Sequence, residues 1–359
     1  MPPRLVWAIL FGFYLAFPAT GQTVWRVRAD AAPGGDGLTW STAFSDLQDA
    51  LAAAHAQPQG ISQDVWIAQG VYRPDGGSGD RTAAFTLDRP VRLLGGFVGT
   101  EAAAADRLNT TPSPVLSGDI GVATVRADNS LHVVRIRDGS AESVLERLVV
   151  RDGNADDAGM SFGRSGGGLL VEDGAPTIDL CIIEFCTARD GAGLFVDTGE
   201  PTVVRTLIRQ NVATTSGGGA YLADGGTISL CVFDANTAPS GGGLFVCCGG
   251  GKITGTLFQG NFGTNGGGCF LGVGGPPVSE CVFISNAATR GAGVYASRSG
   301  GSIVSCRFAS NSATDGGGIY FDLGATAVNC IFTRNTAFSF GGGIYARNNP
   351  AIVGCLLHS

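Results

Sequence analysis

The chain has 359 residues, of which 58 are glycine, and this share is more than twice the usual value of about 7%. Only 15% of the residues are charged, although an ordinary soluble domain has about 25%. The 15 prolines and the lack of a three-residue glycine period exclude collagen, and 44% hydrophobic residues exclude an intrinsically disordered chain. The net charge of −7, without a run of basic residues, argues against a nucleic-acid partner.

Residues 1–21 have the pattern of a signal peptide. Arg4 supplies a positive charge, residues 5–17 are apolar, and small residues at positions 19 and 21 precede a cleavage site before Gln22. The apolar run is shorter than the roughly 20 residues that span a bilayer. We expect cleavage, no transmembrane segment afterwards, and secretion or placement in the cell envelope at the outer membrane surface. An uncleaved anchor is the alternative.

Residues 22–160 lack a clean period and are interpreted as an N-terminal cap and the first coils of a larger structure. Apolar residues at positions 47, 50, 51 and 54 predict a helix over residues 45–56, with Ser45 as its N-cap. Short apolar runs between turn residues predict strands over residues 24–27, 64–68, 91–94, 115–116, 132–136 and 145–150. A helix that covers the first coil would protect its open edge.

A repeat of about 25 residues fills residues 161–359. A glycine-x-glycine tripeptide begins at positions 166, 191, 217, 241, 266, 291, 316 and 341, and each copy precedes a short apolar run. About fifteen residues later comes a second pattern, typically Cys-x-Phe-x-x-Asn. One such unit cannot bury its apolar face, but stacked units form a continuous core. The sequence therefore predicts an all-β parallel solenoid with one repeat per coil, and the last coil, unfinished at Ser359, indicates a chain truncated at its C-terminus.

Stacked coils place each repeat position in a column, with neighbours about 4.8 Å apart. One column is expected to form a ladder of amide hydrogen bonds. It contains Asn211, Asn236, Asn261, Asn286, Asn311 and Asn335. The phenylalanines and cysteines of the second pattern share a strand face, which we assign to the interior. The ten cysteines of an exported chain could form disulfides, but parallel Cβ directions within a column favour buried free thiols.

Several segments resemble secreted bacterial right-handed parallel β-helix proteins. These segments are residues 27–40, 43–51, 65–72, 94–101 (LGGFVGTE), 116–120 and 128–134. The repeated GG-x-aliphatic and F-x-x-N tetrapeptides are similar to those of polymorphic outer membrane proteins. The resemblance implies a right-handed, pectin-lyase-like β-helix with a short N-terminal capping helix, located at a cell surface or outside the cell. Many members of this group have no known activity.

The same fold also contains polysaccharide lyases and glycoside hydrolases, so a catalytic groove has to be considered. The densest polar stretch lies just before the repeats. Its candidate catalytic residues are Arg151, Asp152, Asp156 and Asp157. A solvated loop explains this stretch equally simply and is favoured. His132, within an apolar strand, is expected to be structural, and no metal or cofactor is expected because no C-x-x-C pair or calcium cluster occurs.

A second candidate site is a column of aromatic residues, two positions after each glycine tripeptide. Strand alternation places this column on the outer face, where rings could stack on sugars. It contains Phe195, Tyr221, Phe245, Phe270, Tyr295, Tyr320 and Tyr345. Stacked rings that stabilise the sheet, partly covered by turns, are the favoured alternative.

The hypothesis for function is an exported, non-enzymatic scaffold or adhesin-like protein, with a polysaccharide or the surface of a host or neighbouring cell as its partner. Glycan binding along the aromatic column is one form of this hypothesis. The alternative is a polysaccharide lyase or glycoside hydrolase of the pectin-lyase-like class, which would need two or more carboxylates in one groove.

Overall fold

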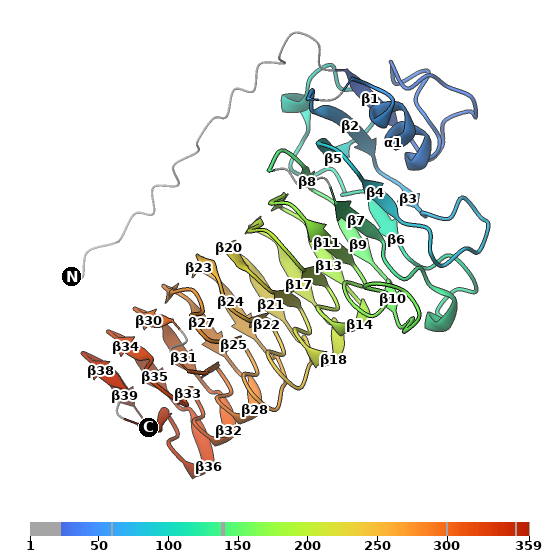
Figure 1. Cartoon of the computed structure of the whole chain (residues 1–359). Coiled ribbons are helices and arrows are strands. Elements are labelled where there is room, and N and C mark those ends of the chain that lie inside the picture. The colour runs from blue at the N-terminus through green and yellow to red at the C-terminus, as the bar shows by residue number, and fades with distance from the viewer. Residues whose placement is uncertain (1–22, 59, 138–140, 299–300, 349, 359) are drawn as a thin grey trace.

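A computed structural model describes residues 23–58, 60–137, 141–298, 301–348 and 350–358. The segment assigned to a signal peptide, residues 1–21, lies outside the described residues. The chain winds into one elongated solenoid of about 12 coils, with the helix near its N-terminal end (Figure 1). All strand pairings that join successive coils are parallel, as the repeat predicts.

Three long sheets form the sides of the solenoid, and each regular coil contributes one strand to each sheet. Sheet A has twelve strands. They are β1 (Val24–Val27), β2 (Gln63–Ala68), β5 (Val91–Phe97), β8 (Val144–Glu146), β12 (Thr177–Asp179), β16 (Thr202–Val204), β20 (Gly225–Ser229), β23 (Gly250–Thr254), β26 (Val278–Ser279), β30 (Ser302–Val304), β34 (Thr326–Val328) and β38 (Ala351–Val353).

Sheet B has eleven strands and follows sheet A around each regular coil. They are β3 (Val71–Tyr72), β6 (Val115–Ser117), β9 (Val149–Arg151), β13 (Ile182–Glu184), β17 (Leu207–Arg209), β21 (Val232–Asp234), β24 (Leu257–Gln259), β27 (Val282–Ile284), β31 (Arg307–Ala309), β35 (Ile331–Thr333) and β39 (Leu356–His358).

Sheet C has ten strands, and two three-stranded sheets lie on the connection from sheet B to sheet C. Sheet C consists of β4 (Phe85–Leu87), β7 (Val134–Arg137), β11 (Leu169–Asp173), β15 (Leu194–Val196), β19 (Ala220–Leu222), β22 (Leu244–Val246), β25 (Cys269–Leu271), β29 (Val294–Ala296), β33 (Ile319–Phe321) and β37 (Ile344–Ala346). The short sheets are β10 (Asn154–Ala155), β14 (Thr187–Asp190) and β18 (Val212–Ser216), and β28 (Ala287–Arg290), β32 (Ser312–Asp315) and β36 (Thr336–Phe340).

The helix α1 (Leu47–His55) covers the first coil, which confirms the predicted helix near the N-terminus. Its buried residues Leu47, Ala50, Leu51 and Ala54 belong to the same core cluster as the residues of β1 and β2. The helix begins two residues later than predicted, because Asp46 and not Ser45 accepts the hydrogen bond from the Gln48 amide. Two short 3₁₀ helices, η1 (Ala104–Asp106) and η2 (Arg126–Asp128), lie in the connections of the first coils.

The interior consists of columns of identical or similar side chains. Five phenylalanines of sheet B are buried and stacked, with adjacent ring centroids 4.8–4.9 Å apart. They are Phe233, Phe258, Phe283, Phe308 and Phe332. The cysteines that precede four of them, two positions earlier, are also buried, and all ten cysteines of the chain are free thiols. Both features agree with the predicted interior face.

The asparagine column forms the predicted ladder. The amide nitrogen of Asn236 donates to Oδ1 of Asn261 over 3.1 Å, and the same oxygen accepts the backbone N–H of Asn236 over 3.0 Å. The side chain of Asn261 in turn donates to the carbonyl of Phe233. The pattern repeats from Asn211 to Asn335, and it satisfies backbone groups that would otherwise be buried without partners.

Two corners of each regular coil are made by a single residue in the left-handed region. These positions are mostly not glycine: Leu180, Arg205 and Leu230 have φ values of 53°, 49° and 55° at the corner between sheets A and B. The predicted strand over residues 145–150 was wrong for this reason. Arg147, with φ 54°, forms this corner and divides the segment into β8 and β9.

Glycine is required at the third corner, where the tripeptides lie. Gly241 has φ 62°, and a Cβ atom on Gly243 would lie 2.5 Å from the carbonyl oxygen of Gly268 in the next coil. The first glycine of each tripeptide thus permits the turn, and the third permits the close contact between coils.

Asn261→Ala should lower the free energy of unfolding by about 3 kcal/mol. The change leaves the Phe233 carbonyl and the Asn236 N–H buried without these partners, at about 1–3 kcal/mol for each group. Chemical denaturation monitored by circular dichroism measures the loss. Gln259→Ala, on the outer face of β24, is the control and should change stability by less than about 0.5 kcal/mol. Equal effects of the two changes would contradict the structural role of the ladder.

Candidate functional site

A cavity of about 310 Å³ opens on the side of the solenoid, beside the N-terminal part of sheet B. Its volume is at the lower end of the range that is usual for small-ligand sites. The lining combines two carboxylates, two guanidinium groups, other polar groups and one aromatic ring. It consists of Asp119, Thr124, Arg126, Asn129, Arg151, Asp152 and Phe185.

Coil stacking brings these residues together from distant positions in the sequence. Strand β9 pairs with β6 on one side and with β13 on the other, so that Arg151 lies between Ser117 and Glu184. Asp152 is the left-handed corner residue after β9, with φ 64°, and Phe185 is the equivalent corner residue of the next coil, with φ 57°. Both corners therefore direct their side chains to the same side of sheet B.

Arg151 connects the charged and aromatic parts of the cavity. Its Nε atom lies 2.7 Å from a carboxylate oxygen of Asp152, and its guanidinium carbon lies 5.2 Å from the ring centre of Phe185. It also lies 3.8 Å from the carboxylate of Glu184, which binds Arg209 over 2.6 Å. A row of alternating charges thus fixes the orientation of Arg151 along the outer face of sheet B.

The carboxyl group of Asp152 has a pKa above its ordinary value. Burial is the main cause, and the nearby charge of Asp119 adds to it, while Arg151 and Arg126 act in the opposite direction. Two oxygen atoms beside it, Oδ1 of Asp119 and Oδ1 of Asn129, are buried without a hydrogen-bond partner. Unsatisfied buried acceptors are uncommon in folded proteins, and two of them in one lining distinguish this cavity from the regular columns of the solenoid.

The structure brings together two of the four predicted candidates. Arg151 and Asp152 line the cavity, whereas Asp156 forms an ion pair with Arg81 over 2.6 Å. Asp157 accepts the backbone N–H of Gly159 over 2.7 Å and shapes a surface turn. Sequence reasoning missed the other lining residues, because Asp119, Arg126 and Asn129 precede the regular repeats and only the pairing of β6 with β9 reveals their position.

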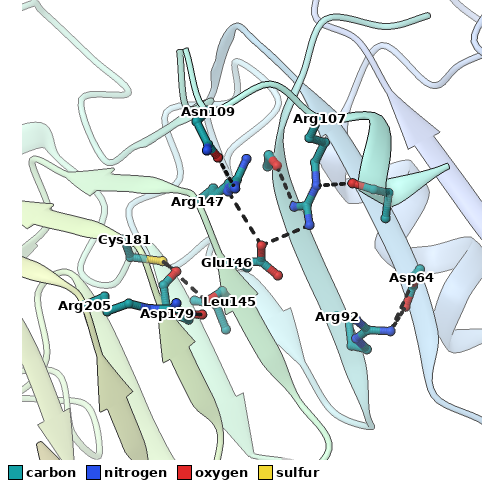
Figure 2. Close-up of polar contacts among 12 residues, drawn as sticks. Asp64, Arg92, Arg107, Asn109, Leu145, Glu146, Arg147, Asp179, Cys181 and Arg205 are labelled. Atoms are coloured by element: carbon teal, nitrogen blue, oxygen red, sulfur yellow. Dashed lines mark hydrogen bonds and ion pairs between the residues drawn. The ribbon is translucent and has the colours of Figure 1, made fainter. Parts of the chain in front are cut away.

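A second group of charges lies on the outer face of sheet A, where it is internally neutralised (Figure 2). Glu146 is 3.0 Å from Arg107 and 3.7 Å from Arg147. Further pairs join Asp64 to Arg92 over 3.2 Å and Asp179 to Arg205. Each carboxylate is occupied by a guanidinium from a neighbouring coil or turn, so this group stabilises the stacking and leaves no free acid or base for catalysis.

His132 has the structural role that we expected. Its ring is buried, and Nδ1 lies 3.0 Å from the carbonyl oxygen of Gly166. Burial lowers the pKa of the imidazole, so the neutral form is favoured. Among the residues that the structure describes, no group of three or more His, Cys, Asp or Glu side chains could hold a metal ion.

The aromatic column lies on the outer face of sheet C, as strand alternation predicts. From Phe195 to Tyr320 its rings are stacked, with centroids 4.7–5.1 Å apart and interplanar angles of 8–20°. Phe195 and Tyr320 have exposed fractions of only 8% and 4%. The ring faces thus contact neighbouring rings, whereas stacking on a sugar needs a free ring face. Ligand binding along this column stays a prediction.

Asp152→Asn should raise the melting temperature at neutral pH. A folded-state pKa above the unfolded value means that stability falls as pH rises through the Asp152 pKa, because the charged form is penalised. The uncharged asparagine avoids this penalty and tolerates the left-handed conformation. Thermal melts should show the difference at pH 7 and show it shrinking below about pH 4, where the free aspartate is protonated.

Asp156→Asn is the matched control, because this carboxylate is exposed and bound to Arg81. Its melting temperature should equal that of the unchanged protein or fall below it at neutral pH. A stability difference for Asp152→Asn that is independent of pH would contradict the effect of burial.

One family model and one solved structure, a pectate lyase, agree with this architecture. The model of the family described as "right handed beta helix region" matches residues 204–357. The match to the pectate lyase Pel9A covers 93% of this chain and 79% of the lyase chain, at 12% identity and a TM-score of 0.53. The match to the pectin methylesterase from Aspergillus niger covers 93% of this chain and 85% of the esterase chain, at 14% identity and a TM-score of 0.36.

A further match is the A-module of the mannuronan C-5 epimerase AlgE4 from Azotobacter vinelandii. The match covers 93% of this chain and 97% of the module, at 14% identity and a TM-score of 0.31. The comparison with curated proteins found no match. Within the described ranges, the one α-helix is too short to cross a membrane. The repeats, the three parallel sheets and the similarity to pectate lyase together identify the chain as a right-handed parallel β-helix protein with the pectin-lyase-like fold.

Proposed function

We propose that the chain is an exported, adhesin-like β-helix scaffold that binds a polysaccharide of a cell surface in the cavity beside Asp152, without cleaving it. Export is supported by the signal-peptide pattern of residues 1–21. The observation that carries the binding proposal is the composition of the cavity, in which two carboxylates and two guanidinium groups surround the ring of Phe185.

This composition suits a saccharide because sugar hydroxyl groups both donate and accept hydrogen bonds. The carboxylate of Asp119 and the amide of Asn129 line the cavity as acceptors for hydroxyl groups, and the guanidinium of Arg126 would donate hydrogen bonds to them. Phe185 provides the apolar surface on which the C–H face of a sugar ring can lie. Binding without cleavage is supported by the ion pair over 2.7 Å between Asp152 and Arg151, because it engages the carboxylate that would have to deliver a proton to a glycosidic bond.

Arg126→Ala and Phe185→Ala should each weaken retention of the protein on an immobilised polysaccharide by about tenfold or more. A hydrogen bond to a charged group contributes about 1.5–3 kcal/mol, and 1.4 kcal/mol corresponds to a factor of ten. Affinity chromatography on a panel of neutral and acidic polysaccharides first identifies the binding polymer, and titration with its oligomers measures the loss.

The control is Arg298→Ala, which removes one exposed positive charge from a distant coil. It should retain the affinity of the unchanged protein. The proposal fails if no polysaccharide in the panel retains the chain, or if Arg298→Ala weakens binding as much as Arg126→Ala does.

A glycoside hydrolase is the second candidate, and one observation favours it. Asp119 and Asp152 line the same cavity, and burial raises the pKa of Asp152, as a catalytic acid requires. In this case Asp152 would protonate the glycosidic oxygen, and Asp119 would act as the second carboxylate that two-carboxylate hydrolysis needs.

Incubation with the retained polysaccharide and measurement of new reducing ends separates the two candidates. The non-catalytic scaffold should release none above the background of a heat-inactivated sample. New ends that disappear in both Asp119→Asn and Asp152→Asn, but persist in Asp156→Asn, would replace the scaffold proposal with the hydrolase.

A further inference from the structure

Two adjacent cysteines lie at the surface, apart from the buried thiols of the core. Cys248 is exposed and Cys247 is partly exposed, whereas seven of the ten cysteines are buried. The pair forms part of the turn between β22 of sheet C and β23 of sheet A (Figure 1). The structural columns explain the buried thiols, but they do not explain why two cysteines occur together in an exposed turn.

Contacts with both neighbouring coils hold this turn in place. On one side the backbone N–H of Cys247 donates to the Leu222 carbonyl over 3.0 Å, and the thiol of Cys248 lies 3.1 Å from the Ala223 carbonyl. On the other side Gly272 packs against the turn so closely that a Cβ atom there would lie 2.0 Å from the carbonyl oxygen of Cys247. The two sulfur atoms are therefore presented by a fixed backbone.

The two thiols also contact each other and an aromatic hydroxyl group. The thiols of Cys247 and Cys248 are close enough to interact, and the Cys247 thiol also interacts with the hydroxyl of Tyr221. The carboxylate of Asp224 is near enough to act on Cys248 electrostatically. Two soft sulfur ligands thus converge beside a negative charge, an arrangement that attracts a cation.

A direct disulfide does not suit this pair. Consecutive Cα atoms are about 3.8 Å apart, and relaxed disulfides need about 4.4–6.8 Å. A metal ion between the sulfurs removes this constraint, because each metal–sulfur bond adds about 2.3 Å to the bridge. Chelation is therefore less strained than oxidation.

We propose that Cys247 and Cys248 form a two-thiolate binding site for a soft, thiophilic cation of the copper(I) class. Thiolate ligands select soft ions, and zinc would need about four ligands, whereas the described residues contain no group of three or more His, Cys, Asp or Glu that could hold a metal. Binding releases two protons, forms two sulfur–metal bonds and changes no oxidation state. The site is separate from the Asp152 cavity and does not depend on its function.

The test titrates copper(I) into the reduced, purified chain under anaerobic conditions, in competition with the chromogenic chelator bicinchoninate. The unchanged protein should withhold one copper(I) per chain, and Cys247→Ser and Cys248→Ser should each lower the affinity by about tenfold or more. Cys355→Ser, which removes another partly exposed thiol, is the control and should withhold the same amount as the unchanged protein.

Circular dichroism melts should show that the serine variants are folded, because the changes lie in a surface turn. No copper withheld by the unchanged protein would overturn the proposal. Serine variants that bind copper(I) as tightly as the unchanged protein would also overturn it, since the metal would then be bound by other thiols of the chain.

Discussion

The structure depends on parallel pairing in register, which places each residue next to its equivalent in the coils before and after it. Val232 lies beside Leu257, and Phe258 lies beside Phe283, because backbone hydrogen bonds fix this register. A side chain in such a column has to be compatible with a copy of itself at about 4.8 Å. Asparagine, phenylalanine and cysteine meet this condition, whereas like charges repel at this distance.

This constraint explains the low charge of the chain and the places where charge occurs. On the outer face of sheet B, Arg151, Glu184 and Arg209 follow one another with alternating sign, so each charge stabilises the next. The cavity departs from this order, because the Asp119 and Asp152 carboxylates lie in one space and Asp119 raises the pKa of Asp152. Such a local conflict is less expected of a purely structural column than of a binding or catalytic site.

The regular half of the fold could be predicted because the physical role of a position repeats with its residue type. The Asn211 to Asn335 ladder and the glycine corner could be predicted from the sequence for this reason. The other corners were not, because Leu180 and Arg205 share a left-handed backbone but no chemistry, and stacking imposes that conformation. Only part of the site could be predicted from the sequence. Arg151 and Asp152 lie next to the repeats, whereas the position of Asp119 depends on a strand register that cannot be read from the irregular first coils.

Stacking also decides which aromatic residues can bind a ligand. In the outer column of sheet C each ring covers the face of the next, so a longer column adds stability and removes binding surface. Phe185 differs, because its neighbours at the same corner are Asp152 and Gln210, and neither covers it with another ring. Arg151 lies over its ring, and the cavity borders it. A solitary aromatic residue at a coil corner is therefore better suited to contact a sugar than a continuous column of rings.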